Sequence, residues 1–261
     1  MSTYILPLIL TLCAGMSTLL GGFITFFVKR NNLKALSVGL GFSAGVMVYV
    51  SLNELMTESP VMLANYFSVP VSKALAFVGF LSGILIAILI DYFIPDHIES
   101  DFLNSSKRVQ QRHRIKRAGL ITAFAVTLHN FPEGMATFLV SSQDLRLGIP
   151  VALAIAIHNI PEGIAIALPI FHATGKKRLA ILYSFLSGIS EPIGGLLGVL
   201  LLKTIMPAQT VGIMTASVAG IMVYLSFDTL LPLAREYGEN HHVIIGIVSG
   251  MLVMGFGLIF L

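Results

Sequence analysis

Two copies of a six-residue motif carry the residues of this sequence that could do chemistry. They are His129-Asn130-Phe131-Pro132-Glu133-Gly134 and His158-Asn159-Ile160-Pro161-Glu162-Gly163. A helix turns about 100° per residue, so Glu133 falls about 40° and Asn130 about 100° around the axis from His129. The histidine, asparagine and glutamate of each copy therefore share one stripe of a helix. We predict that the two stripes hold a common ligand.

A divalent cation is the ligand that suits these side chains. Glu133, Glu162 and Glu191 fall near the middle of long apolar stretches that contain no Lys or Arg. A carboxylate at the centre of a membrane helix costs roughly 2.5–3.5 kcal/mol, so the three together cost on the order of 8–10 kcal/mol without a counter-charge. Neutral imidazole and carboxylate oxygens suit zinc and its first-row neighbours. The only cysteine, Cys13, lies in an apolar run and excludes a thiolate cluster.

The candidate metal ligands are His129, Asn130, Glu133, His158, Asn159, Glu162 and Glu191. These side chains are too many for one tetrahedral ion, so we predict two adjacent sites that share both motif glutamates. The histidines would complete one site. The asparagines and Glu191 would complete the other, whose extra oxygens favour a harder ion such as Fe²⁺ or Mn²⁺. Because metal ligands must be deprotonated, binding should weaken at acidic pH.

Membrane-spanning helices must position these residues. Of the 261 residues, 56% are apolar and only 11% are charged, and the mean hydropathy is +0.88. A soluble domain carries about 25% charged residues, so this composition excludes a water-facing surface and a nucleic-acid-binding protein. We therefore expect an all-α, polytopic membrane protein embedded in a lipid bilayer, with one domain over residues 1–261.

Eight transmembrane helices are expected from windows of about 20 apolar residues, the length that crosses about 30 Å of hydrocarbon. Their ranges are 5–28, 34–56, 71–94, 118–140, 147–170, 178–202, 208–231 and 242–261. The one long connection is a loop at residues 95–117. No Lys or Arg precedes Lys29, so the first segment lacks the charged start of a cleaved signal peptide and is expected to be a retained span.

The distribution of basic residues predicts the orientation. The odd-numbered loops carry 13 Lys and Arg residues and the even-numbered loops carry 3. Positive charge stays in the cytoplasm, so we expect a protein of the plasma membrane (a bacterial inner membrane) with both termini outside and loop 95–117 inside. Four residues near the span ends could guide cations in or out: Glu54 on the outside, and Asp91, His97 and Asp228 on the inside. Ordinary solvated residues are the alternative there.

Internal repeats organise the spans. Three pairs of similar segments occur in the same order: Ala14–Gly22 with Ser187–Gly195, Ala44–Ser51 with Ala219–Ser226, and Gly79–Leu85 with Gly246–Leu252. The members of each pair lie five spans apart, so they cross the membrane in opposite directions. We predict an inverted repeat in a 3+2+3 arrangement, with the two motifs on the central pair. Transporters built from inverted repeats bind their substrate near the midplane.

The duplicated motif, the eight spans and the 3+2+3 repeat resemble the ZIP family of metal transporters over essentially the whole chain. The resemblance implies import of Zn²⁺ and Fe²⁺, and of Mn²⁺, Co²⁺ or Cd²⁺, into the cytoplasm, with no enzyme cofactor. It also implies a binuclear site on spans four to six and a homodimer in which one helix bundle moves against the other. The family pattern places zinc on the histidines and glutamates, and iron on the asparagines, glutamates and Glu191. The glycines of Gly15–Gly22 and Gly188–Gly198 would permit close helix contact in a homodimer.

An intramembrane zinc protease and a metal-selective cation channel are the two alternatives to a metal carrier. An intramembrane zinc protease needs two histidines at i and i+4 with a glutamate base between them. Here Glu133 takes the second ligand position and Pro132 precedes it, so we expect no enzyme. A metal-selective cation channel is the closer alternative. A channel needs weak binding at several sites, whereas histidines with carboxylates favour tighter binding.

Overall fold

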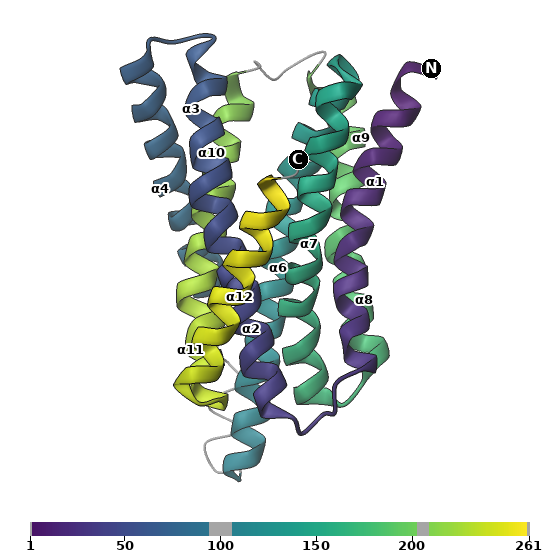
Figure 1. The fold of residues 1–261 in the computed structure, drawn as a ribbon, viewed down its shortest axis with the longest axis vertical. Helices are drawn as coiled ribbons and strands as arrows, with labels where there is room; N and C mark the ends of the chain where they lie inside the picture. Colours follow the sequence, from purple (N-terminus) through teal and green to yellow (C-terminus); the bar gives the residue numbers. More distant parts are fainter. Residues whose placement is uncertain (1, 94–105, 203–208, 260–261) are drawn as a thin grey trace.

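The computed structural model describes residues 2–93, 106–202 and 209–259, and every regular element in these ranges is a helix (Figure 1). The helices are α1 (Ser2–Gly22), α2 (Leu33–Val50), α3 (Met56–Ala64), α4 (Val69–Phe93), α6 (Lys107–Gln143), α7 (Leu145–Thr174), α8 (Lys177–Gly188), α9 (Ser190–Leu202), α10 (Gln209–Leu225), α11 (Leu231–Tyr237) and α12 (Asn240–Ile259). A short 3₁₀ helix, η1 (Phe23–Phe26), follows α1. The π-helical turns η2 (Ser51–Leu55) and η3 (Ser226–Leu230) join α2 to α3 and α10 to α11.

These elements correspond to the eight expected spans and confirm an all-α, polytopic membrane protein. Within the described ranges, seven spans are long and apolar enough to cross a bilayer. The eighth is α6, which begins with a basic stretch and is interrupted in its apolar part by His129, Asn130 and Glu133. Its 37 residues are nevertheless about 55 Å long at 1.5 Å per residue, well above the roughly 30 Å of hydrocarbon.

Two boundaries differ from the sequence-based expectation. The prediction of a loop at residues 95–117 is wrong for its second half, because helix α6 already begins at Lys107. Its first turns are rich in Lys, Arg and Gln, which are good helix formers that a hydropathy window cannot detect. The second span continues to Ala64 rather than ending at residue 56, since the polar residues of α3 end the apolar window but not the helix. Residues 94–105, which include His97, lie outside the described part of the chain.

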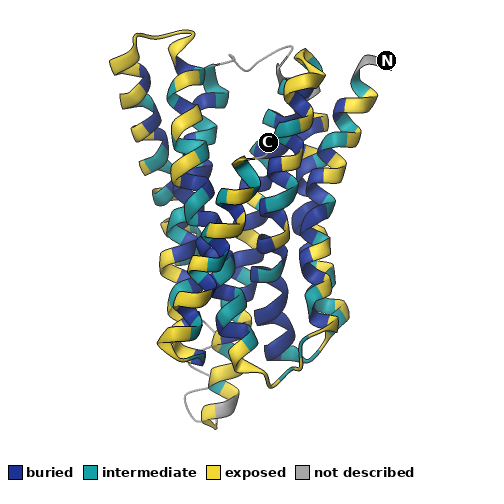
Figure 2. Cartoon of the chain, in the orientation of Figure 1, coloured by how far each residue is buried: buried dark blue, intermediate teal, exposed yellow. Residues whose placement is uncertain are grey.

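The spans pack as two bundles. We call α1, α6, α7, α8 and α9 the motif bundle, and α2, α3, α4, α10, α11 and α12 the second bundle; within them α1 packs on α7, α6 on α7 and α9, α2 on α12, and α4 on α10. The bundles meet where α2 lies against α7 and α10 against α6. Figure 2 shows buried residues concentrated in the centre of the molecule and exposed residues on the outer faces of helices such as α4 and α12. The motif helices therefore lie in the interior.

The two halves of the second bundle are built alike, as the inverted repeat predicts. A Cβ atom on Gly83 of α4 would overlap the Ser217 carbonyl oxygen of α10, and one on Gly250 of α12 would overlap the Phe42 carbonyl oxygen of α2. The π-helical turns begin at the equivalent residues Ser51 and Ser226. Both serine hydroxyls donate to the carbonyl oxygen four residues earlier, at 2.6 and 2.8 Å. Spans two and three thus match spans seven and eight.

Candidate metal centre

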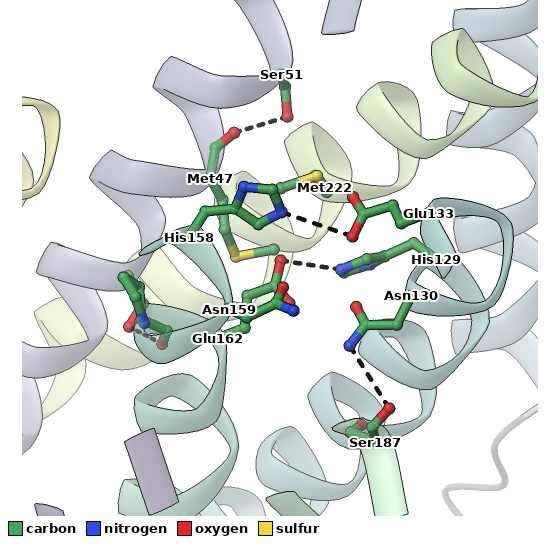
Figure 3. Close-up of polar contacts among 12 residues, drawn as sticks. Met47, Ser51, His129, Asn130, Glu133, His158, Asn159, Glu162, Ser187 and Met222 are labelled. Atoms are coloured by element: carbon green, nitrogen blue, oxygen red, sulfur yellow. Dashed lines mark hydrogen bonds and ion pairs between the residues drawn. The ribbon is translucent and has the colours of Figure 1, made fainter. Parts of the chain in front are cut away.

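The two motif copies lie side by side at the middle of α6 and α7, with Pro132 and Pro161 inside the helices. Their side chains point into the space between the helices (Figure 3). All of the candidate ligands are buried: His129, Asn130, Asn159, Glu162 and Glu191 are 0% exposed, His158 is 1% and Glu133 is 6% exposed. The structure therefore places all of the candidate ligands in the interior of the protein.

Each histidine pairs with the glutamate of the other motif copy. His129 Nε2 lies 3.0 Å from Glu162 Oε1. His158 Nε2 lies 3.5 Å from Glu133 Oε2. The two helix stripes consequently face each other, and the four groups form two pairs that cross between α6 and α7 (Figure 3).

The asparagines and Glu191 lie on the side of the site nearest α9. Asn159 Nδ2 donates to the Ala14 carbonyl oxygen at 3.0 Å and to the Glu191 carboxylate. The nitrogen of the Asn130 amide lies 3.5 Å from the Ser187 carbonyl oxygen, and turned over the same amide donates to Glu162 Oε2 at 3.2 Å. Both asparagine side chains and Glu191 therefore contact another candidate ligand or a backbone carbonyl oxygen beside the site.

Gly134 permits α9 to approach this closely. A Cβ atom at this position would overlap the Glu191 carbonyl oxygen. The last residue of the first motif copy therefore has a packing role, because any larger residue would push Glu191 away from Asn159.

Several buried polar atoms of the site lack a hydrogen-bond partner. They are His129 Nδ1, Glu133 Oε1, His158 Nδ1, Asn159 Oδ1 and Glu191 Oε2. Glu133 Oε2 and His158 Nε2, which form the 3.5 Å ion pair with each other, make no hydrogen bond either. A buried polar group without a partner costs about 1–3 kcal/mol, so such groups at one place point to a missing ligand. No three His, Cys, Asp or Glu side chains of the described residues yet converge on one point. An ion would therefore have to replace the His–Glu pairs by small side-chain rotations.

Comparison with known proteins identifies the family of the chain. The family model "ZIP Zinc transporter" matches residues 95–258. A protein named zinc transporter ZupT from Clostridium perfringens is 43% identical over 99% of this chain and 97% of its own length. Proteins of the same name from Akkermansia muciniphila (44% identical, 96% of each chain) and Nitratidesulfovibrio vulgaris (47% identical, 96% of this chain and 95% of the relative) are equally similar.

The chain belongs to the ZIP zinc transporter family. It is therefore a membrane transporter of divalent metal ions and not an enzyme, which removes the intramembrane zinc protease from consideration.

In this ZIP protein a cavity leads to the paired side chains from one end of the molecule. It has a volume of about 70 Å³ and is lined by Glu133 and His158 together with Glu54, Glu58 and Met62. Its other walls come from the C-terminal half of α6 and the N-terminal halves of α7 and α10. These parts lie at the end of the molecule opposite the connections that carry most basic residues (Figure 1). The candidate site is thus approached from that end.

The structure places the expected pathway residues at opposite ends. Glu54 lines the cavity above the site, whereas Asp91 and Asp228 line a separate pocket at the basic end. Glu58 also lines the cavity and was missed by sequence reasoning, although it follows Glu54 by four residues and so shares its helix face.

Two methionines also face the site. Met47 and Met222 are fully buried, and Figure 3 shows their side chains reaching toward the site from α2 and α10. Met47 and Met222 occupy equivalent positions in the repeated segments Ala44–Ser51 and Ala219–Ser226. This equivalence could have indicated from the sequence that both lie near the site.

Proposed function

We propose that this ZIP protein imports Zn²⁺ and Fe²⁺, and also Mn²⁺, Co²⁺ or Cd²⁺, through the buried site between α6, α7 and α9. The observation that carries the proposal is the crossed pairing of His129 with Glu162 and of His158 with Glu133. The sequence contains no Lys or Arg between Arg117 and Arg146, or from there to Lys176. A doubly charged cation is therefore the natural counter-charge for the carboxylates.

Two adjacent ions are part of this proposal. The histidines and glutamates would hold zinc in one position. Asn130, Asn159, Glu191 and the shared glutamates would form the second position. The contact between Asn159 and Glu191, together with the unpartnered Glu191 Oε2, supports a second cluster of oxygen donors. Oxygen-rich sites favour harder ions, so this position would accept Fe²⁺ or Mn²⁺.

The direction of transport follows from the basic residues. The α1–α2 and α7–α8 connections and the ends of α6 and α11 that carry them lie together at one end of the molecule (Figure 1). We place this end in the cytoplasm and both termini outside the plasma membrane, a bacterial inner membrane. The cavity then opens to the outside, as an importer waiting for its substrate requires.

A carrier fits the site better than the alternative, a metal-selective channel. The candidate ligands are buried and the cavity reaches them from one end. A channel would need a continuous path with weak binding at several sites. Metal uptake that saturates would support a carrier, and conductance that keeps rising with metal concentration would support a channel.

A homodimer, which the resemblance to the ZIP family implies, remains part of the proposal. The glycines that were expected to permit contact between two copies of the protein instead permit close packing of helices within one chain. A Cβ atom on Gly15 would overlap the Gly188 carbonyl oxygen, and the reverse is also true. Cross-linking of the reconstituted protein at low density would test the dimer directly.

Uptake into sealed vesicles is the experiment that tests this function. Vesicles with the reconstituted protein should accumulate Zn²⁺, Fe²⁺ and Mn²⁺. Glu133→Ala removes a shared ligand and should abolish uptake of all three, whereas His158→Ala should impair Zn²⁺ more than Fe²⁺ and Mn²⁺. Glu191→Ala should impair Fe²⁺ and Mn²⁺ more than Zn²⁺. Crystals soaked in zinc or cadmium should show anomalous density between α6, α7 and α9. Absence of such density, with uptake unaffected by the variants, would contradict the proposed site.

A further inference from the structure

Two ion pairs join the bundles at the end of the molecule opposite the cavity. Arg117 Nη2 on α6 donates to Asp91 Oδ1 on α4 at 3.3 Å. One turn earlier on α6, Arg114 Nη1 lies 3.9 Å from Glu236 Oε1 on α11. Since α6 belongs to the motif bundle and α4 and α11 to the second bundle, both pairs cross between the bundles.

The same residues surround a pocket. The pocket has a volume of about 250 Å³, and its charged lining residues are Asp91, Arg114, Arg117, Asp228 and Glu236. We call these five residues the inner seam. The acidic residues all come from the second bundle and the arginines all come from the motif bundle. The acids would attract a departing metal ion, whereas the arginines paired with Asp91 and Glu236 neutralise two of the three carboxylates.

Arg117 is the better placed of the two arginines. The side chains of Arg117 and Asp91 are 31% and 32% exposed, against 63% and 44% for Arg114 and Glu236. Less exposed pairs are screened less by water and salt. Arg117 also lies twelve residues before His129 on the same helix, which corresponds to about 18 Å along α6. A displacement of the site along α6 would therefore move Arg117 as well.

We propose that Arg117 is the inner gate of the transporter, a tethered cation that occupies Asp91 while the site is open to the outside. This inference rests on the proposed function. When the motif bundle shifts against the second bundle, Arg117 leaves Asp91. The carboxylates of Asp91 and Asp228 then face the arriving dication. The ion pair thus closes the exit, and the Asp91 carboxylate becomes available to the metal ion only when the exit opens.

Cysteine accessibility tests the gate without relying on transport. Ile121 lines the inner-seam pocket, so Ile121→Cys in a Cys13→Ser background reports its opening. The purified full-length protein in nanodiscs is treated with N-ethylmaleimide, which reaches both faces. We expect Arg117→Ala to raise the labelling rate about two- to five-fold, the population shift that one partly exposed ion pair can hold. Lys116→Ala, which removes an exposed positive charge from the same turn, is the matched control.

Exchanging the two charges distinguishes loss of the Arg117–Asp91 ion pair from a general destabilisation of the helix packing. The double variant Asp91→Arg with Arg117→Asp should return labelling to the slow rate of the parent protein, whereas Asp91→Asn alone should label as fast as Arg117→Ala. The gate is refuted if Arg117→Ala labels no faster than Lys116→Ala, or if the exchanged pair stays fast. Failure of the parent protein to transport zinc would instead contradict the proposed function and leave the labelling result standing.

Discussion

His129 of the first motif copy contacts Glu162 of the second, with 3.0 Å between Nε2 and Oε1. The reciprocal pair joins His158 to Glu133 at 3.5 Å. Neither helix therefore holds a complete set of contacts by itself. A metal ion that replaces these pairs has to bridge α6 and α7, so loading would tie the two motif helices together.

Glu162→Gln should abolish the zinc site while keeping the shape of the side chain. The amide cannot supply the negative charge that the buried ion requires. We expect zinc affinity to fall at least about 10- to 100-fold, the loss already seen when only the partners of metal ligands are removed. Calorimetric titration of the purified protein measures this loss. Glu239→Gln makes the same change at an exposed residue and should leave zinc affinity unaltered.

The paired change Asn130→Ala with Asn159→Ala should alter metal preference more than overall binding. The amides belong to the oxygen-rich position, so Fe²⁺ and Mn²⁺ should be weakened more than Zn²⁺. Competition between two metals for uptake gives the preference ratio in a single experiment. Equal losses for all metals, or no loss for any, would contradict the division into two positions.

Gly134→Ala should separate α6 from α9. The added Cβ overlaps the Glu191 carbonyl oxygen, and overpacking of this kind costs about 1–3 kcal/mol. We expect a lower thermal unfolding midpoint and weaker Fe²⁺ uptake. Gly198→Ala is the control, because its Cβ would meet Met135 at 3.5 Å or more, an ordinary contact. If both variants unfold alike, the close approach at Gly134 is not required.

The paired change Glu54→Gln with Glu58→Gln should slow the capture of metal. Both residues line the cavity that leads to the site, and a cleft lined with one sign of charge raises the local concentration of counter-ions. KM for zinc should rise by up to about 10-fold at low salt, with the maximal rate preserved. The difference should shrink as ionic strength increases. A KM effect that is independent of salt would argue for direct ligation instead.

Metal binding should weaken as the pH falls. Protons and the metal compete for the same imidazole nitrogens and carboxylate oxygens, so each added proton opposes binding and each bound ion releases protons. Titration of zinc in two buffers of different ionisation enthalpy counts the protons released. Zinc affinity that stays constant from neutral to acidic pH would count against carboxylate and imidazole ligands.

The eight spans could be predicted from the sequence because the length of an apolar segment must match the thickness of the hydrocarbon layer. The start of α6 at Lys107 could not, since a charged stretch that continues beyond the membrane is helical for reasons that hydropathy does not measure. The same limit hid the extension of the second span to Ala64.

The composition of the site was predictable and its pairing was not. The 3.6-residue period places His129 and Glu133 on one stripe of one helix, but the rotation of α6 against α7 depends on packing elsewhere. Gly163 of α7, for example, lies so close to the Thr18 carbonyl oxygen of α1 that a Cβ atom would overlap it. Such contacts between distant parts of the chain set the position of α7, and a helical period read from one segment does not contain them.

The packing of α12 on α2 has a consequence for biosynthesis. Gly41 and Gly45 of α2 face backbone atoms of α12, a helix that the ribosome delivers long after α2. During translation that face of α2 lacks its partner until α12 is inserted. A nonsense mutation before Asn240 would leave it uncovered permanently, and the nascent chain would become a substrate for membrane quality control.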